Sequence, residues 1–251
     1  MSKDNEPFPE TADIESSSDE YARRFSGAAG EWMLEVQERA TLNFFKGEEI
    51  KTVLDVGGGH GQLAIPLCEA GYEVTVLSSA PECKKRISSM FDSGKCGFIV
   101  GNVIDLPFPD KSFDVVISFR MVTHCRQWQK LIAELCRVSK KFVVLDYPTS
   151  QSLNMVAPRL FDLKKKVETD TRHWALFKHT EISDELNRNG FQKIKRTGQF
   201  FLPMVLHRML KSRKLSAALE RVCRFFRLTD KWGSPIVLRA DRAEKSATQQ
   251  N

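Results

Sequence analysis

Hydrophobic and polar positions follow two alternating patterns between residues 48 and 148. Short, nearly continuous runs of Val, Ile and Leu are typical of strands that are buried on both faces of a parallel sheet. Between these runs, apolar residues recur every three or four positions, as they do on one face of a helix. The predicted strands are KTVLDV (51–56), YEVTVLS (72–78), GFIVGN (97–102), FDVVISF (113–119) and KFVVLDYP (141–148).

Predicted helices separate these strands, and the alternation continues towards the end of the chain. The other predicted elements are one or two helices in 19–47, helices at 61–70, 81–91, 127–139 and 180–191, strands at 191–201 and 234–242, and helical insertions at about 150–180 and 203–230. The pattern predicts an α/β fold with a doubly wound, mostly parallel sheet of seven strands. Ligands of such sheets bind outside the carboxyl ends of the strands, so we expect the insertions to form a helical lid there.

The length of 251 residues suits one such domain. We expect an acidic disordered tail at 1–19, the domain at 20–242 and a second tail at 243–251. No apolar run approaches the roughly 18 residues of a membrane span, and the N-terminus lacks an apolar signal-peptide core, so a cytoplasmic location is expected. The six cysteines form no CxxC pair, which predicts free thiols and no metal site.

Candidate chemistry begins at VLDVGGGHG (53–61), where a buried strand breaks into glycines before a helical pattern. Glycines let the backbone turn sharply and approach a ligand closely, and the following helix would present its N-terminus to that ligand. A dinucleotide fingerprint requires G-x-G-x-x-G, but counted from Gly57 its last position is Gln62. No Lys-Ser/Thr pair follows the glycines, which excludes a P-loop.

The segment resembles motif I of the class I S-adenosylmethionine (SAM) methyltransferases, whose defining positions are filled here by Asp55, Gly57, Gly59 and Gly61. YEVTVLSSAPECKKRI (72–87) looks like the second-strand motif of that family. GNVIDLPFPDKSFDVVIS (101–118) is similar to the loop-and-strand signature of its generic small-molecule and quinone-biosynthesis-like branch. The resemblance covers roughly residues 20–148 and implies a Rossmann-like fold.

The resemblance also implies where SAM binds. Gly57 and Gly59 would let main-chain N–H groups reach the methionine carboxylate, and Asp55 would anchor the turn or meet the amino group through water. Two positions depart from the family pattern. Ser78 stands where an acidic residue usually binds the ribose, and Asn102 stands where an aspartate often receives the adenine amino group.

Further residues are expected around the cofactor on the same grounds. Arg24 could pair with the methionine carboxylate, with Tyr21 beside it. The backbone around Val103 and Ile104 would flank the adenine. Phe119, at the end of the fourth predicted strand, completes the predicted cofactor site.

Histidines supply the candidates for contact with an acceptor. His124 follows the fourth strand and could take a proton from a substrate hydroxyl or an acidic carbon; alternatively, it packs or hydrogen-bonds a loop carbonyl. His173 and Trp174 lie in the first insertion, and His207 lies in the second. Each could contact substrate, and packing within the fold is the alternative for all three.

The net charge of +6 is concentrated late in the chain. In LSAALERVCRFFRL (215–228), Leu215 and Val222 share an apolar helical face, and Arg221 and Arg224 lie opposite. One hypothesis is an interfacial helix that makes weak contact with anionic lipid. The favoured interpretation is a lid helix whose apolar face packs on the core while its basic face is solvated.

Together, these features predict a SAM-dependent methyltransferase that acts on an oxygen or carbon of a small, apolar molecule. An alternative is a non-catalytic binding module with the same fold, suggested by Ser78. An RNA methyltransferase is a weaker alternative, because the (D/N)-P-P-(Y/F) motif of amino-methylating nucleic-acid enzymes is replaced by SFRM (118–121). We therefore expect a small-molecule acceptor and no nucleic-acid partner.

Overall fold

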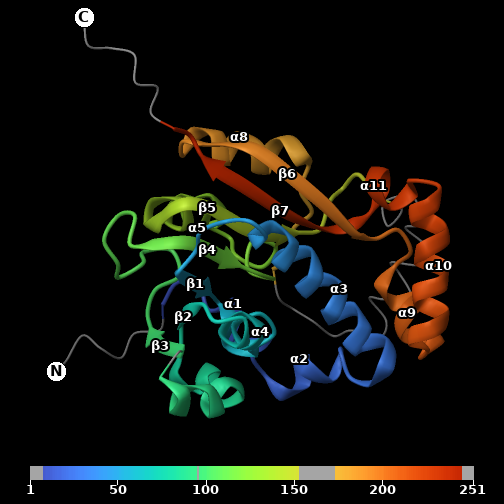
Figure 1. Cartoon of the computed structure of the whole chain (residues 1–251), viewed down its shortest axis with the longest axis horizontal. Coiled ribbons are helices and arrows are strands. Elements are labelled where there is room, and N and C mark those ends of the chain that lie inside the picture. Colours follow the sequence, from blue (N-terminus) through green and yellow to red (C-terminus); the bar gives the residue numbers. More distant parts are fainter. Residues whose placement is uncertain (1–7, 95, 153–172, 245–251) are drawn as a thin grey trace, which may run out of the picture.

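The computed structural model describes residues 8–94, 96–152 and 173–244, and these residues form a single seven-stranded sheet flanked by helices (Figure 1). The order of the strands is β3 (Cys96–Val100), β2 (Glu73–Ser78), β1 (Thr52–Val56), β4 (Phe113–Ser118), β5 (Ser139–Tyr147), β7 (Ser234–Arg242) and β6 (Phe191–Phe200). The first five strands are parallel, and β7 runs antiparallel to both β5 and β6. The predicted doubly wound, mostly parallel sheet of seven strands is therefore confirmed.

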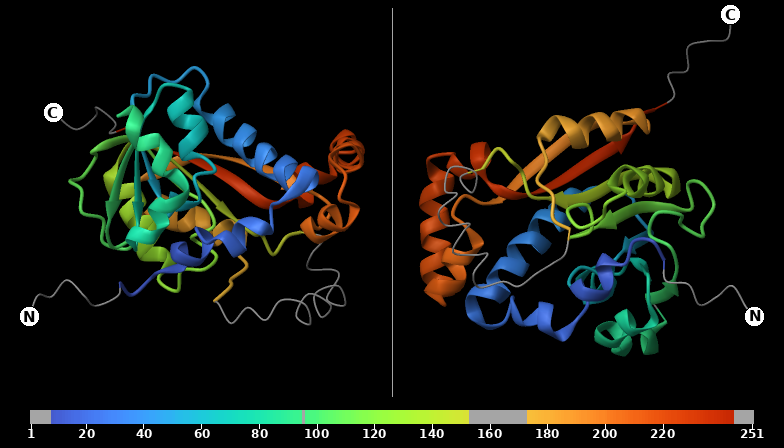
Figure 2. Two further views of the ribbon diagram at one scale, coloured as in Figure 1. Left: turned by 90° about the horizontal axis from the view of Figure 1, so that it is seen from below. Right: turned by 180° about the vertical axis from the view of Figure 1, so that it is seen from behind.

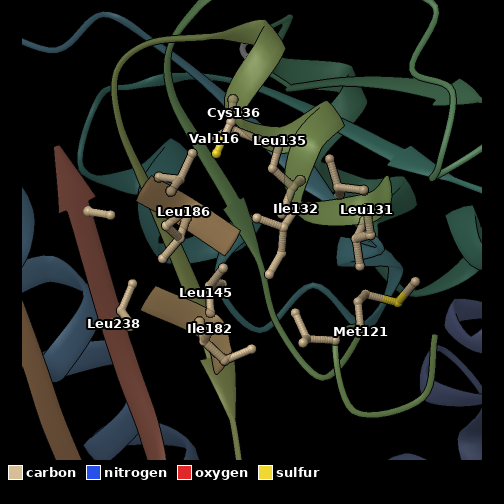
Figure 3. Packing of buried hydrophobic residues seen from close by; sticks show 14 of the residues in the cluster. Val116, Met121, Leu131, Ile132, Leu135, Cys136, Leu145, Ile182, Leu186 and Leu238 are labelled. Atoms are coloured by element: carbon tan, nitrogen blue, oxygen red, sulfur yellow. The ribbon is translucent and has the colours of Figure 1, made fainter. Parts of the chain in front are cut away.

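Alternate side chains of the central strands enter two hydrophobic clusters, one on each face of the sheet. Val53 belongs to the cluster beneath α3 (Gly27–Phe45) and α4 (Ala64–Glu69), whereas Leu54 belongs to the opposite cluster. Leu131, Ile132 and Leu135 of α5 (Trp128–Val138) and Ile182 and Leu186 of α8 (His179–Arg188) pack into that second cluster (Figure 3). Burial on both faces explains why the strands are nearly continuous apolar runs.

The second predicted insertion, 203–230, is three short helices rather than one long helix. These are α9 (Met204–Leu210), α10 (Arg213–Phe225) and α11 (Leu228–Trp232). The breaks occur at Lys211 and Arg227, whose φ angles of 50° and 58° lie in the left-handed region and end each helix. The three helices form one end of the molecule in every view, and we call them the helical cap (Figures 1 and 2).

The predicted boundary of the domain at residue 20 is wrong at its N-terminal side. Within the expected tail, α1 (Ala12–Ser16) is helical, and α2 (Asp19–Arg23) follows it. The Asp13 side chain is completely buried. Local composition suggested disorder, but long-range contacts described below stabilise this segment.

Other differences are smaller. The helix predicted at 61–70 is preceded by a 3₁₀ turn at Gly58–His60 and begins at Ala64, and the helix predicted at 81–91 is a 3₁₀ helix at Pro81–Ser93. Most of the first predicted insertion, 150–180, lies outside the described residues, as does the predicted tail beyond residue 244. No helix among the residues with a described structure is long and apolar enough to cross a membrane.

Candidate functional site

The glycine turn at the carboxyl end of β1 leaves no space for side chains at the positions of its glycines. Gly57 has a φ of 80°, and its N–H donates to the Leu77 carbonyl at 2.8 Å. A Cβ atom on Gly57 would lie 2.6 Å from Sδ of Met121, and one on Gly58 would lie 2.1 Å from Oδ2 of Asp55. Only glycine fits these positions, and the Gly57 N–H, which was predicted to reach a methionine carboxylate, is used here by the Leu77 carbonyl.

A buried acid and a partly buried arginine face this turn. Burial raises the pKa of Asp55 to about 7, and the charge of Arg120 opposes that rise. Arg120 follows β4 with a φ of 61°, which is unusual for a residue with a side chain. Its Nε and Nη1 atoms are buried and form no hydrogen bond with any described residue. Arg120 therefore keeps donors available beside Asp55.

A chain of polar side chains fixes the backbone of Arg120. The Arg120 N–H donates to Oδ1 of Asp146 at 2.6 Å, and Nε2 of Gln37 donates to Oδ2 of Asp146 at 2.9 Å. Nε2 of Gln62 in turn donates to Oε1 of Gln37 at 2.5 Å. Burial raises the pKa of Asp146 to about 6, which the Arg120 N–H partly offsets. The network links α3, β5 and the turn, and so holds Arg120 in its left-handed conformation.

Aromatic rings cover the guanidinium. Cζ of Arg120 lies 5.4 Å from the ring centre of Tyr21 and 5.6 Å from that of Phe25. His60 meets both rings edge-on, with centroid distances of 6.3 Å. Burial, followed by the charges of Arg120 and Arg86, lowers the pKa of His60 to about 3, so His60 is neutral at physiological pH. Tyr21 therefore lies at the predicted site, and Arg120 is one of the cationic side chains beside its ring.

Helix α1 lies on the other side of the turn, against the end of β2. The Asp13 carboxylate accepts hydrogen bonds from the N–H of Ser79 at 2.6 Å and from its hydroxyl at 2.5 Å. Burial raises the pKa of Asp13, although these bonds from Ser79 oppose the shift. A Cβ atom on Gly59 would lie 2.5 Å from Oγ of Ser17. A carboxylate thus lies beside Ser78, where β2 lacks the acidic residue of the family pattern. It belongs to Asp13 of α1 and not to β2.

The space left at the turn is small. A cavity of about 10 Å³ is lined by Asp55, Gly57, Gly58, Gln62, Leu63, Phe119 and Arg120. This volume is roughly what one water molecule needs. With α1 in place, this cavity has the donors and acceptors of a ligand site and is much smaller than a nucleoside.

Comparison with known proteins agrees with this geometry. Residues 54–144, which run from β1 to β5, match the family model described as a methyltransferase domain. Residues 54–144 are thus similar to a class I SAM-dependent methyltransferase domain. The match includes the glycine turn, Asp55 and Arg120, whereas Asp13, Gln37 and Asp146 lie outside the matched residues.

Curated relatives align over part of their length. Ajmaline N-methyltransferase of Rauvolfia serpentina is 26% identical over 139 residues, which are 49% of this chain and 46% of the relative. A ubiquinone/menaquinone biosynthesis C-methyltransferase of Bradyrhizobium sp. is 29% identical over 133 residues, which are 49% of this chain and 52% of the relative. The chain thus spans about half the length of these relatives.

Solved structures share the fold over nearly the whole chain. A possible histamine N-methyltransferase of Thermotoga maritima superposes with a TM-score of 0.63 at 17% identity, covering 92% of this chain and 98% of the other. Magnesium protoporphyrin IX methyltransferase of Synechocystis, solved with S-adenosylhomocysteine (SAH), gives a TM-score of 0.60 at 16% identity, covering 90% and 94%. At these identities the likeness concerns the fold.

Other predicted cofactor residues of the methyltransferase domain occupy the same edge of the sheet. Oδ1 of Asn102 accepts the Ile104 N–H at 3.1 Å, so this side chain shapes its own loop. Val103 is fully buried in the cluster that also contains Met121. Nη2 of Arg24 lies 3.9 Å from Oε1 of Glu15, and its Cζ lies 5.1 Å from the ring centre of Tyr21. Arg24 and Arg120 therefore both stack on Tyr21, and Arg120 also lines the cavity with Asp55.

The predicted acceptor residues fall into two separate places. Nδ1 of His124 lies 2.8 Å from the carbonyl oxygen of His173, a contact that joins the loop after β4 to the segment before α8. This loop-carbonyl hydrogen bond is the structural alternative to catalysis for His124. Trp174, next to His173, is 39% exposed.

His207 lies in the helical cap, away from the glycine turn. It is fully buried, with Nε2 3.2 Å from Oε1 of Glu220 and its ring 5.2 Å from that of Trp32. Glu220 also accepts the N–H groups of Phe201 and Leu202, at 3.0 and 2.8 Å. These contacts lower the pKa of Glu220 despite its burial. His207 therefore has a structural partner within the cap.

Sequence reasoning missed Asp13, Arg120 and Asp146. Arg120 follows the fourth predicted strand, but no spacing distinguishes it from the many other arginines. Asp13 was hidden by the acidic composition around it. All six cysteines are free and buried, and among the described residues no group of three or more His, Cys, Asp or Glu side chains is placed to hold a metal ion.

Proposed function

We propose that the chain binds SAM at the glycine turn and transfers its methyl group to an oxygen or carbon of a small, apolar molecule, releasing SAH. The observation that carries this proposal is the buried, unpaired guanidinium edge of Arg120 beside a glycine turn that excludes side chains. A guanidinium is suited to bind a carboxylate, and the turn lets the backbone approach it without side chains in the way.

The residues at the turn fit the charges of SAM. Arg120 would hold the methionine carboxylate, Asp55 would accept from the ammonium group, and Tyr21 and Phe25 would exclude water. When bound, SAM supplies an electrophilic methyl group on a sulfonium. The chain then has to orient an acceptor and keep water out, which requires little acid–base chemistry. The proposal therefore does not depend on His124 acting as a base.

Helix α1 has to withdraw before the nucleoside part of SAM can enter. The cavity of about 10 Å³ is far smaller than the several hundred Å³ of a small-molecule site. Asp13 and Ser17 lie against Ser79 and Gly59, at the end of β2 and on the turn. The described structure is thus a closed form, and we propose that cofactor binding selects an open one.

The acceptor atom is the least constrained part of the proposal. The relatives described above are named for methylation at nitrogen or carbon, and their acceptors differ widely. The expectation of an apolar acceptor rests on the sequence, because Phe200 and Met204 pack in a core cluster with Trp32. Product analysis by mass spectrometry with candidate oxygen, carbon and nitrogen acceptors distinguishes the three outcomes.

Isothermal titration calorimetry with SAH tests the cofactor site. Arg120→Met should weaken SAH binding by about 10- to 100-fold, because it removes charge-assisted hydrogen bonds to the carboxylate. Arg23→Met, which removes an exposed arginine at the end of α2, is the matched control and should change affinity little. Thermal unfolding of each variant checks that the fold is retained.

The non-catalytic alternative makes a different prediction in the same experiment. If neither SAM nor SAH binds the wild-type chain at millimolar concentration, the methyltransferase proposal fails. If SAH binds equally well to Arg120→Met and to the wild type, the proposed position of the carboxylate is wrong.

A further inference from the structure

Helix α10 of the helical cap is packed by its polar side. Ser216, Glu220 and Cys223 are buried against the rest of the molecule. Glu220 is held there by the bonds from Phe201 and Leu202 described above and by the hydroxyl of Thr229 at 3.3 Å. This orientation is the reverse of the favoured sequence interpretation, in which the apolar face of the helix packs on the core.

The apolar side of α10 consequently faces solvent. Leu215, Val222 and Phe225 are 46%, 56% and 81% exposed, and Phe226, just after the helix, is 65% exposed. With Ala218, which is also exposed, these residues recur at helical spacing and form one stripe, which we call the apolar stripe. Exposed single hydrophobic residues are ordinary, but a stripe with two adjacent phenylalanines marks an interaction surface.

The neighbouring helices of the cap also expose large apolar side chains. Met209 of α9 is 73% exposed, and Trp232 of α11 is 44% exposed. α9, α10 and α11 lie together at one end of the molecule (Figure 2). Large apolar side chains are therefore concentrated on the cap.

The same end of the molecule is strongly basic. Residues 204–232 contain eight Lys or Arg residues and two acidic ones, Glu220 and Asp230. Glu220 is buried, so its carboxylate lies inside the protein and not at the surface. On the helical wheel, Lys214 and Arg221 border the apolar stripe, and both are exposed. Aromatic and aliphatic groups bordered by cations characterise helices that lie in the interface of an anionic membrane.

We propose that the helical cap docks on the surface of an anionic lipid bilayer. The apolar stripe, led by Phe225 and Phe226, enters the boundary between headgroups and acyl chains. Lys214 and Arg221 meet lipid phosphates beside it. Charge complementarity favours lipid over a second copy of this chain, because two copies joined through this face would oppose their basic residues. The proposal is independent of the methyltransferase activity.

Vesicle co-sedimentation of the full chain tests the proposal. We expect binding to vesicles of phosphatidylcholine with about one third phosphatidylserine, and weaker binding to phosphatidylcholine alone or at high salt. The double substitution Phe225→Ser/Phe226→Ser should reduce partitioning into the anionic vesicles by about tenfold or more, because it removes the two most inserted rings. Both rings are largely exposed, so the fold should be retained.

Ile99→Ser provides the matched control, because Ile99 is a 37% exposed hydrophobic residue on β3, outside the cap. This variant should bind vesicles as the wild type does. The proposal is overturned if the wild type ignores anionic vesicles, or if the double variant binds them unchanged. It is also overturned if the wild type instead self-associates with rising concentration and the double variant does not, since the stripe would then join copies of the chain.

Discussion

Two acids buried near the glycine turn, Asp55 and Asp146, differ from surface carboxylates because burial disfavours their charged forms. The pKa of Asp55 is raised to about 7 and that of Asp146 to about 6. In the unfolded chain both would titrate near 4. The folded state therefore binds more protons than the unfolded state between about pH 4 and 7. Stability contributed by these groups is lost as the pH rises through that window.

Asp55→Asn should consequently become more stable relative to the wild type as the pH rises from about 4 to 7. The uncharged amide has no ionised form to bury, so the difference in the free energy of unfolding should grow by about 1–4 kcal/mol across this range. Urea unfolding at several pH values measures it. An Asp110→Asn control, at an exposed carboxylate, should show no such growth. A pH-independent difference between Asp55→Asn and the wild type would contradict the raised pKa.

Motif spacing was sufficient to predict the tight turn at Gly57 and Gly59 after Asp55, because the demands of such a turn are local and appear in the order of residues. Arg120 could not be predicted in this way. Its importance depends on a left-handed backbone held by Asp146 and Gln37, which lie on distant elements. Side-chain chemistry alone does not reveal which of many arginines is buried without a hydrogen-bond partner.

At the scale of elements, α1 is the helix whose position most alters the geometry expected for the site. It places Asp13 beside Ser78, at the end of β2, where the sequence appeared to lack an acid. It also fills the space beside Gly57 and Gly59 that we propose for the nucleoside of SAM. The contacts that hold it, from Asp13 to Ser79 and from Ser17 to Gly59, join residues more than 40 positions apart.

Asp13→Ala should strengthen SAH binding by about 5- to 30-fold, because it removes hydrogen bonds that stabilise the closed form and that cost about 1–2 kcal/mol to break on opening. Calorimetry measures the change. Glu20→Ala, an exposed acid on the neighbouring helix α2, is the control and should leave affinity unchanged. Weaker binding by Asp13→Ala would instead show that the Asp13 carboxylate contacts the cofactor and replaces the acid absent at Ser78.

Long apolar strands and strongly periodic helices were predicted well. β1, β2, β4, β5, α5 and α8 lie where the pattern placed them, because burial of one face or both faces leaves a clear period in the sequence. The cap was predicted as a helical insertion without internal bounds, because its breaks at Lys211 and Arg227 carry no glycine or proline signal. The packed side of α10 was also predicted wrongly, since a buried Glu220 is stable only with its four donors from three other segments.

At the scale of the whole molecule, Glu220 fastens the helical cap to the sheet. Its carboxylate joins α9 through His207, α11 through Thr229 and the end of β6 through Phe201 and Leu202. Each of these donors is buried or partly buried. Loss of the carboxylate would therefore leave several polar groups without partners at once.

Glu220→Ala should lower the free energy of unfolding by about 3–5 kcal/mol, as expected when one partner of a buried, hydrogen-bonded pair is removed. Chemical denaturation monitored by circular dichroism measures the loss. Asp230→Ala, whose carboxylate is 62% exposed and pairs with an exposed arginine, should cost less than about 1 kcal/mol. Equal losses in the two variants would show that Glu220 does not hold the cap.

The sequence by itself determined the sheet, the position of the glycine turn and the class of fold, because strand burial and tight turns impose local patterns of hydrophobicity and glycine. Only the tertiary structure decided that Arg120 faces the turn, that α1 closes it and that the apolar stripe of α10 is exposed. These features depend on contacts between segments that are far apart in the chain. Local periodicity reports that a helix has an apolar face, but the partners available in the folded molecule determine which face is packed.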